Sequence, residues 1–368
     1  MKNKITLLIP ILLFSANLYA ENPARSIAGY MPVAIYGNDD RAEFYQTDEI
    51  SKKLASSTAA LFRSKDLSDL GNGFHQIRPV TLKEKFNLNE NEAFSDQPAV
   101  SFCSAALVGK DLILTSAHCL SQVPCEKIKI AFDYRIESAG RYPEFLKSQD
   151  IYSCKSVVSQ KYDPNGADYA IIKTDRQVNR TPLPVNRKDD IKKNTKVFVI
   201  GYPSGLPVKI ANNAKVREVK TEFFITDLDT FKGNSGSPVF NNETMKIEGV
   251  LSRGGTDYMY NSYVSETPEA DPRNPNSPIY RPGTAHKVGQ DEGRGEDVTK
   301  SFVFQALIPQ SDFEKALNEA IKQGVRFERE KQNGIRPAVY TPSDWGQTQI
   351  QPAVYYPPVN TKPEVIEI

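Results

Sequence analysis

A run of small residues at positions 230–239 has the character of a turn that holds a reactive serine. It reads Thr-Phe-Lys-Gly-Asn-Ser-Gly-Ser-Pro-Val and lies between two apolar segments. Glycine permits a backbone with positive φ, so that successive N–H groups can point into one concavity. A serine nucleophile needs an adjacent base and hydrogen-bond donors for the developing oxyanion. We therefore predict Ser235 as the nucleophile and the N–H groups of Gly233 and Ser235 as the oxyanion hole; the alternative is an ordinary Gly/Ser hairpin turn.

Candidates for the base and its carboxylate lie upstream. The sequence has three histidines, at positions 75, 118 and 286, and only His118 directly follows a strand-like segment. Asp168 opens an apolar stretch, where a carboxylate without a partner is unfavourable. Taken singly, His118 could be a hydrogen-bonded histidine at a strand end and Asp168 a strand cap. Together with Ser235 they follow the chain order of chymotrypsin-type triads, and not that of subtilisins or α/β-hydrolases.

The elements that would position these residues are mostly short strands separated by Gly, Pro and Asn turns. Strands are predicted at 58–62, 99–108, 112–116, 128–134, 156–158, 169–173, 196–200, 208–210, 214–219, 222–225, 238–240 and 248–252. One helix is predicted at 312–323, capped by Ser311 and ended by Gly324, with its apolar residues on one face. Residues 256–300 have the composition of a long polar loop. This pattern indicates an all-β barrel or sandwich.

Composition and the two ends of the chain suggest an exported protein. Residues 1–20 have the charged start, short apolar run and small-residue end of a signal peptide. No segment is apolar over a length that would span a bilayer, so we expect no membrane insertion. Lys and Arg number 46 against 45 Asp and Glu, a net charge of +1, which argues against a nucleic-acid partner. The predicted location is therefore secreted or periplasmic.

The cysteines fit this location. In an exported chain, Cys103, Cys119, Cys125 and Cys154 are most simply explained as two disulfides. Sequence spacing alone leaves three connectivities open. A zinc site is disfavoured, because the sequence holds no Cys-x-x-Cys pair.

The predicted organisation has four parts. Residues 1–20 are the signal peptide, and residues 21–54 are either a pro-segment or an arm packed on the domain. Residues 55–325 form the main domain, with a first half at about 55–185 and a second at about 190–325. Residues 326–368 form a tail that contains Pro and Tyr and is predicted to be disordered.

The chain resembles chymotrypsin-fold (trypsin-like) serine endopeptidases, in the bacterial branch of the glutamyl endopeptidases. The resemblance rests on Leu-Thr-Ser-Ala-His-Cys at 114–119, Asp-Tyr-Ala-Ile-Ile at 168–172, Gly-Tyr-Pro at 201–203 and Gly-Asn-Ser-Gly-Ser-Pro at 233–238. It covers about residues 55–325 and implies two six-stranded antiparallel β-barrels and a C-terminal helix, with the active site between the barrels. It also implies a disulfide between Cys103 and Cys119.

The same resemblance bears on activation. Trypsin-like zymogens use an aspartate just before the nucleophile to bind a new amino terminus, and here that position is Asn234. In glutamyl endopeptidases the mature amino terminus helps to recognise the substrate. Residues 33–35, Val-Ala-Ile, are similar to that start, which implies that residues 21 to about 33 are removed.

For substrate binding the resemblance points to residues near the serine and on the following strand. They are Asp229, Thr230, Leu251, Ser252, Arg253 and Gly254. Asp229 stands where trypsin-like members hold Arg or Lys, and a buried carboxylate there favours a basic side chain. Thr230 matches a pocket threonine of glutamyl endopeptidases, but Leu251 replaces their glutamate-binding histidine. Residues 252–254 are expected to pair with the extended substrate. We predict cleavage after basic residues, although Asp229 could instead be an exposed loop residue.

The predicted function is that of a secreted serine endopeptidase, acting through an acyl-enzyme on protein or peptide substrates. No cofactor or metal is required, and we expect a monomer. One alternative is a non-catalytic, adhesin-like binding protein on the same fold. A second is an esterase that uses the same three residues.

Overall fold

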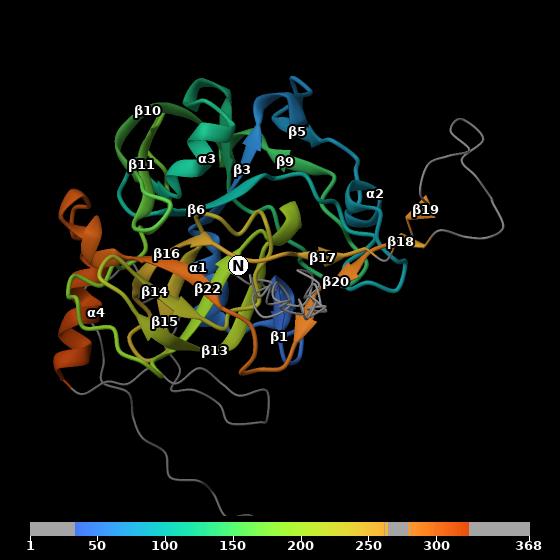
Figure 1. The fold of residues 1–368 in the computed structure, drawn as a ribbon. Coiled ribbons are helices and arrows are strands. Elements are labelled where there is room, and N and C mark those ends of the chain that lie inside the picture. Colours follow the sequence, from blue (N-terminus) through green and yellow to red (C-terminus); the bar gives the residue numbers. More distant parts are fainter. Residues whose placement is uncertain (1–33, 261, 264–278, 281, 324–368) are drawn as a thin grey trace, which may run out of the picture.

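Two β-barrels stacked on each other make up most of the molecule (Figure 1). The computed structural model describes residues 34–260, 262–263, 279–280 and 282–323. The predicted signal peptide and the predicted tail lie outside these residues. Within them, no helix has the length and apolar character needed to cross a bilayer.

The first barrel contains six antiparallel strands in the closed order β10-β11-β7-β6-β3-β8. These are β3 (Thr58–Arg63), β6 (Cys103–Leu107), β7 (Leu112–Thr115), β8 (Ile128–Ala131), β10 (Ile151–Tyr162) and β11 (Asp168–Thr174). A small sheet beside it contains β4 (Leu67–Asp69), β5 (Phe74–Ile77) and β9 (Phe145–Lys147).

The second barrel closes in the same way, with six antiparallel strands in the order β12-β15-β16-β22-β14-β13 and a further pairing of β12 with β13. These are β12 (Lys196–Gly201), β13 (Lys209–Val219), β14 (Phe223–Thr226), β15 (Pro238–Asn241), β16 (Ile247–Arg253) and β22 (Glu296–Lys300). The all-β, two-barrel fold class is confirmed.

Burial on both faces explains why several strands are continuous apolar runs. In β3, Leu61 points into the first barrel, whereas its neighbour Phe62 packs in the cluster shared by both barrels. In β12, Val199 lies in the interior of the second barrel and Phe198 in the shared cluster. Successive strand residues face opposite sides, so both faces require apolar side chains.

An N-terminal arm packs on the second barrel. Its strand β2 (Arg41–Glu43) pairs with β13, and β1 (Ile35–Tyr36) pairs with β21 (Lys287–Val288). Two more short strand pairs occur in the described residues: β17 (Tyr258–Met259) with β20 (Thr284–Ala285), and β18 (Ser262–Tyr263) with β19 (Ile279–Tyr280). Residues 35–36 and 41–43 of this region are therefore joined to the second half of the chain by strand pairing.

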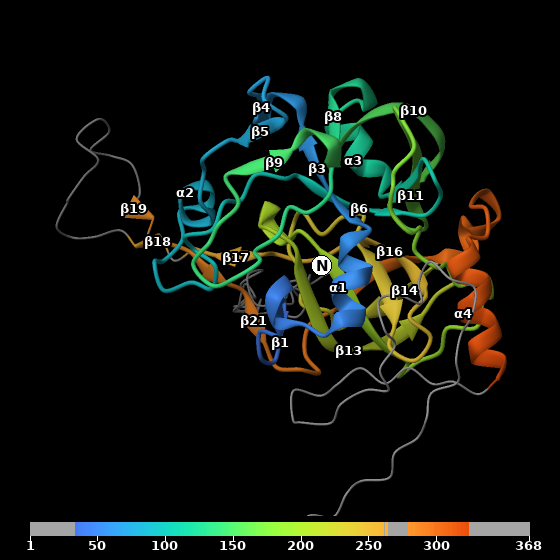
Figure 2. The same ribbon diagram turned by 180° about the vertical axis from the view of Figure 1, so that it is seen from behind.

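Four α-helices occur in the described residues. The predicted helix is α4 (Asp312–Lys322), whose first turn is capped by the Ser311 side chain, and it lies along the second barrel (Figure 2). The sequence pattern gave no sign of α1 (Glu49–Ser56), α2 (Leu82–Phe86) or α3 (Ala117–Gln122).

Two details of the strand predictions were wrong. Residues 208–210 and 214–219, predicted as separate strands, belong to the single strand β13. Strand β22 lies inside the predicted loop 256–300 and is fully buried between β14 and β16. Its sequence, Glu-Asp-Val-Thr-Lys, has one apolar residue, so periodicity could not reveal it.

Candidate active site

The structure brings His118 and Asp168 into direct contact. His118 lies in the first turn of α3, and Asp168 is the first residue of β11. The imidazole Nδ1 is 2.6 Å from Asp168 Oδ2, and the carboxylate is fully buried while the ring is about one-quarter exposed. A carboxylate on Nδ1 leaves Nε2 free to accept a proton from a nucleophile.

Backbone donors fix the Asp168 carboxylate. Its Oδ1 accepts hydrogen bonds from the N–H groups of Ala117 (2.7 Å) and His118 (3.2 Å). These N–H groups lie at the start of α3, where a helix provides no backbone acceptor for them. A carboxylate is favoured at this end of a helix. The same interaction therefore orients the histidine and satisfies the buried charge.

A residue of the second barrel, Thr299, supports Asp168 from the other side. The Asp168 N–H donates to Thr299 Oγ1 at 2.9 Å, and this hydroxyl lies 3.1 Å from Ser252 Oγ. Thr299 belongs to β22, the strand that sequence analysis missed. Its only sequence signal was a threonine in a polar stretch.

Ser235 lies on a tight turn pressed against the first barrel. Its carbonyl accepts a hydrogen bond from Ser104 N–H at 2.8 Å and lies 3.7 Å from Cys119 Sγ, one residue after His118. Gly236, with φ of +90°, is needed because a Cβ there would lie 2.1 Å from the Ser104 carbonyl oxygen. The structure thus places Ser235 beside the histidine segment.

Gly233, the second predicted oxyanion donor, occupies a similarly tight position. Its φ is +103°, and a Cβ would come within 2.7 Å of the Tyr202 carbonyl oxygen. The Gly233 carbonyl accepts a hydrogen bond from Ser104 Oγ at 2.7 Å. Only glycine fits this backbone, which accounts for the residue type.

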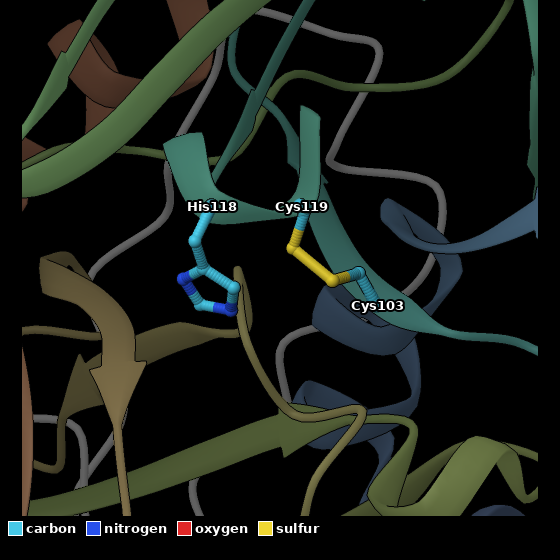
Figure 3. Close-up of side chains that lie close together, drawn as sticks. All are labelled: Cys103, His118 and Cys119. Carbon is cyan, nitrogen blue, oxygen red and sulfur yellow. A yellow bond between two sulfur atoms is a disulfide. The ribbon is translucent and has the colours of Figure 1, made fainter. Parts of the chain in front are cut away.

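Both disulfides lie in the first barrel, joining Cys103 to Cys119 and Cys125 to Cys154. The first confirms the pairing implied by the resemblance. Figure 3 shows it beside the His118 ring, next to the short helix. Among the described residues, Cys103, His118 and Cys119 are the one group close enough to hold a metal ion, but both sulfurs are already bonded to each other. A thiolate, not a disulfide, is the metal ligand.

Asp229 is buried and bound to the N-terminal arm. Its two carboxylate oxygens accept hydrogen bonds from the N–H groups of Tyr36 (2.8 Å) and Asp40 (3.0 Å). Burial raises the pKa of Asp229 to about 6. The alternative of an exposed loop aspartate is wrong, and the carboxylate is engaged within the protein.

Thr230 also contacts the arm. Its N–H donates to the Ala34 carbonyl at 3.0 Å, and its hydroxyl donates to Glu296 at 2.6 Å. Glu296, on β22, was not among the predicted site residues.

The remaining predicted binding residues differ in what they offer to a substrate. Leu251 packs its side chain in the interior of the second barrel, and its carbonyl accepts from Ser116 Oγ and Gly236 N–H. Arg253 pairs with Asp297 at 2.8 Å and donates to the carbonyls of Asp163 and Gly166. Gly254, at the end of β16, is exposed.

Sequence comparison finds similarity to known peptidases. Residues 103–250 match the family model described as "Trypsin-like peptidase domain". Over these residues the chain is similar to trypsin-like peptidases. A glutamyl endopeptidase of Staphylococcus epidermidis is 26% identical over 232 residues, covering 55% of this chain and 78% of that protein. A glutamyl endopeptidase of Staphylococcus aureus (strain MW2) is 29% identical over 173 residues, covering 44% of this chain and 49% of that protein.

Solved structures with weak similarity include a human heparin binding protein, with a TM-score of 0.41 and 16% identity over 74% of this chain and 94% of that one. Another is the Vibrio cholerae VesB protease, with a TM-score of 0.40 and 11% identity over 71% of this chain and 65% of that one. At these values they add nothing to the fold, which the strand pairing already defines. The family match and the endopeptidase relatives support a serine-type peptidase.

Proposed function

We propose that the chain hydrolyses peptide bonds through a triad of Ser235, His118 and Asp168. The observation that carries this is the 2.6 Å contact between His118 Nδ1 and the fully buried Asp168, beside a turn that holds Ser235. Ser235 Oγ attacks the scissile carbonyl while His118 Nε2 takes its proton. Asp168 keeps the proton of the imidazole on Nδ1 and stabilises the imidazolium that forms.

The oxyanion of the tetrahedral intermediate lies against the N–H groups of Gly233 and Ser235. As the intermediate collapses, His118 returns the proton to the leaving amine and an acyl-Ser235 ester remains. Water, deprotonated by His118, then hydrolyses this ester. Fixed donors of this kind stabilise the transition state more than the ground state, and losing one reduces kcat by about 10²–10³-fold.

Two features support proteins or peptides as substrates. Ser252 and Arg253 end β16 and the next residue, Gly254, is exposed, so an extended backbone can add here as a further strand. The curated relatives are named as endopeptidases. We further propose export, with residues 1–20 removed as a signal peptide, and a monomeric enzyme.

The N-terminal arm is part of the proposed substrate site. Ala34 and Tyr36 contact Thr230 and Asp229 through backbone hydrogen bonds. This supports a mature amino terminus near residue 33, in line with the similarity of residues 33–35 to the start of glutamyl endopeptidases. Sequencing the amino terminus of the secreted protein tests it, and an intact residue 21 in active enzyme would contradict it.

The decisive experiment is labelling by a fluorophosphonate probe together with cleavage of a peptide library, with Ser235→Ala as control. We expect the wild type to be labelled at Ser235 and to cut peptides, and the variant to do neither. Labelling with turnover of small esters but no peptide cleavage would indicate an esterase. A folded, mature protein that is neither labelled nor active would indicate a binding protein.

A further inference from the structure

The loop that leads into Asp168 is held by side chains of the second barrel. Residues 163–167 connect β10 to β11, and Asp168 follows them directly. Within the loop, the Gly166 N–H donates to the Asp163 carbonyl at 3.1 Å, and the Asp163 N–H donates to the Ala167 carbonyl at 2.9 Å. These bonds use neither the Gly166 carbonyl nor the Ala167 N–H. Both of these groups bind side chains of the second barrel instead.

Arg253, the last residue of β16, makes two of the bonds to this loop. Its Nη1 donates to the Asp163 carbonyl at 3.1 Å, and its Nη2 donates to the Gly166 carbonyl at 2.8 Å. Its Nε donates to the buried Asp297 at 2.8 Å. All three nitrogens of the side chain therefore donate within the protein. Because a guanidinium is planar and rigid, the bond to Asp297 also fixes the direction of the two donors that face the loop.

Two further side chains of the second barrel hold the end of the loop. Glu222, which directly precedes β14, accepts a hydrogen bond from the Ala167 N–H at 3.0 Å. Thr299 on β22 accepts one from the Asp168 N–H at 2.9 Å. Strand β22 lies between β14 and β16, so these two residues and Arg253 come from neighbouring parts of one sheet. The first barrel thus contacts the triad carboxylate, and the second holds the backbone that precedes it.

The bonds of Arg253 bear on the role that the resemblance gave it. The resemblance pointed to this residue as a substrate-binding residue, but its guanidinium binds the loop and Asp297 in the protein without a substrate. Its side chain therefore acts on the loop at all times. The backbone of β16 remains the part that an extended peptide can pair with.

We infer that Arg253 is a positioning residue of the proposed triad: by fixing the 163–167 loop, it fixes the place of Asp168. The inference rests on the proposed function. The Asp168 carboxylate meets His118 Nδ1 at 2.6 Å and two N–H groups of α3, so a shift of the loop would disturb three bonds at once. A misplacement of about 1 Å in an active site can cost about 10²-fold in rate.

The test compares Arg253→Ala with Arg294→Ala in the mature, secreted protein. Both arginines donate to Asp297 Oδ2 at 2.8 Å, but Arg253 also binds the loop, whereas Arg294 donates to the Gly295 carbonyl. Each variant leaves Asp297 with one guanidinium, so the buried carboxylate stays paired and both proteins should fold. The two variants lose the same ion pair, and only Arg253→Ala releases the loop.

Two properties are measured on each protein. The rate at which a small fluorophosphonate labels Ser235 reports the triad without an extended substrate, and the final amount of label gives the concentration of competent enzyme. Values of kcat and KM, per labelled enzyme, are then measured on a peptide that the wild type cleaves. The same peptide with an aspartate three residues before the cut tests whether the guanidinium binds an acidic substrate.

We expect Arg253→Ala to lower the labelling rate and kcat by about 10- to 100-fold, equally on both peptides, with KM within a few-fold of the wild type. Arg294→Ala should stay within a few-fold in every property. Arg253→Lys keeps a charge beside Asp297 but lacks the planar fork, so it should be as slow as the alanine variant. It decides the matter if Arg253→Ala does not fold.

Three results would overturn the inference while leaving the triad intact. A higher KM, mainly for the acidic peptide, with an unchanged labelling rate would make Arg253 a substrate-binding residue. Equal losses in Arg253→Ala and Arg294→Ala would assign the effect to Asp297. Full activity of Arg253→Lys would show that the bonds to the loop are not needed. Absence of labelling in the mature wild type would instead overturn the proposed function.

Discussion

The two barrels are stabilised in different ways. The first has an apolar interior and both disulfides, and in the described residues its buried carboxylates are Asp66 and Asp168. The second barrel and the parts packed on it bury many more charges: Arg41, Glu43, Lys209, Asp227, Asp229, Glu248, Glu296, Asp297, Lys300 and Glu314. The first barrel thus fixes the geometry of His118 and Asp168 by packing and covalent bonds. The second buries charged side chains that are held by ion pairs or by hydrogen bonds, and it carries the proposed substrate-binding residues.

This difference has a physical consequence. A buried ion pair contributes little net stability, but removing one partner is strongly destabilising. Changes in the second barrel should therefore alter stability and pH dependence, whereas changes at the triad should alter the chemical step.

The largest effect is expected at the triad carboxylate. Asp168→Asn should lower kcat by about 10⁴-fold, because the amide no longer holds the imidazole in the productive tautomer. The backbone donors of Ala117 and His118 can still bind the remaining carbonyl oxygen, so the fold should persist. Steady-state kinetics and thermal unfolding check both expectations. A loss smaller than about tenfold would exclude Asp168 from the triad.

The largest effect on stability is expected where the N-terminal arm joins the second barrel. Lys209 Nζ is buried and binds Glu43 at 3.0 Å and Gln97 at 2.9 Å. Lys209→Met leaves the Glu43 carboxylate without its counter-charge and should lower the free energy of unfolding by about 3–5 kcal/mol. Urea denaturation measures it.

A second variant separates the charge effect from lost packing. Lys209→Met combined with Glu43→Met removes both charges and should recover part of the stability. If the double variant is less stable than the single one, the ion pair is not what fastens the arm.

The disulfides of the first barrel provide the complementary comparison. The pair Cys103–Cys119 closes 16 residues and Cys125–Cys154 closes 29. Replacing either pair by alanine should lower the free energy of unfolding by about 3 kcal/mol. Only replacement of the Cys103–Cys119 pair should also reduce kcat, because Cys119 follows His118 and contacts the Ser235 carbonyl. Equal kinetics in the two double variants would contradict a positioning role for this disulfide.

The sequence was most informative where local chemistry is distinctive. The turn around Ser235 needs glycines, and the strands of both barrels are apolar on both faces, so these could be predicted. The polar strand β22 could not, because its residues Glu296, Asp297 and Thr299 are buried through partners far along the chain. Helix α3 was missed because its six residues are too few for a periodic pattern, and its start is stabilised by Asp168.

The candidate binding residues show the same limit. The resemblance pointed to Asp229 and Thr230 as substrate-binding residues, but it could not show that the arm binds Asp229. Nor could it show that Leu251 faces the barrel interior while Gly254 is exposed. The face of the sheet to which a side chain points depends on the strand register. The register between β16 and β22 shifts at an irregularity between Leu251 and Arg253.

The smallest effect is expected at Asp257, beside the Ser235 turn. Its carboxylate accepts the Lys232 N–H at 3.0 Å, and burial raises its pKa to about 6 from the ordinary 3.8. Between these two values the unfolded chain has lost the proton and the folded protein retains it. Stability should therefore fall as pH rises from about 4 to about 6, by about 1–3 kcal/mol, and change no further from this group above that range. Asp257→Asn removes the titration, so the difference in unfolding free energy between variant and wild type should grow across this window. Urea denaturation at pH 4, 5, 6 and 7 measures it, and a constant difference would show that burial does not raise the pKa of Asp257.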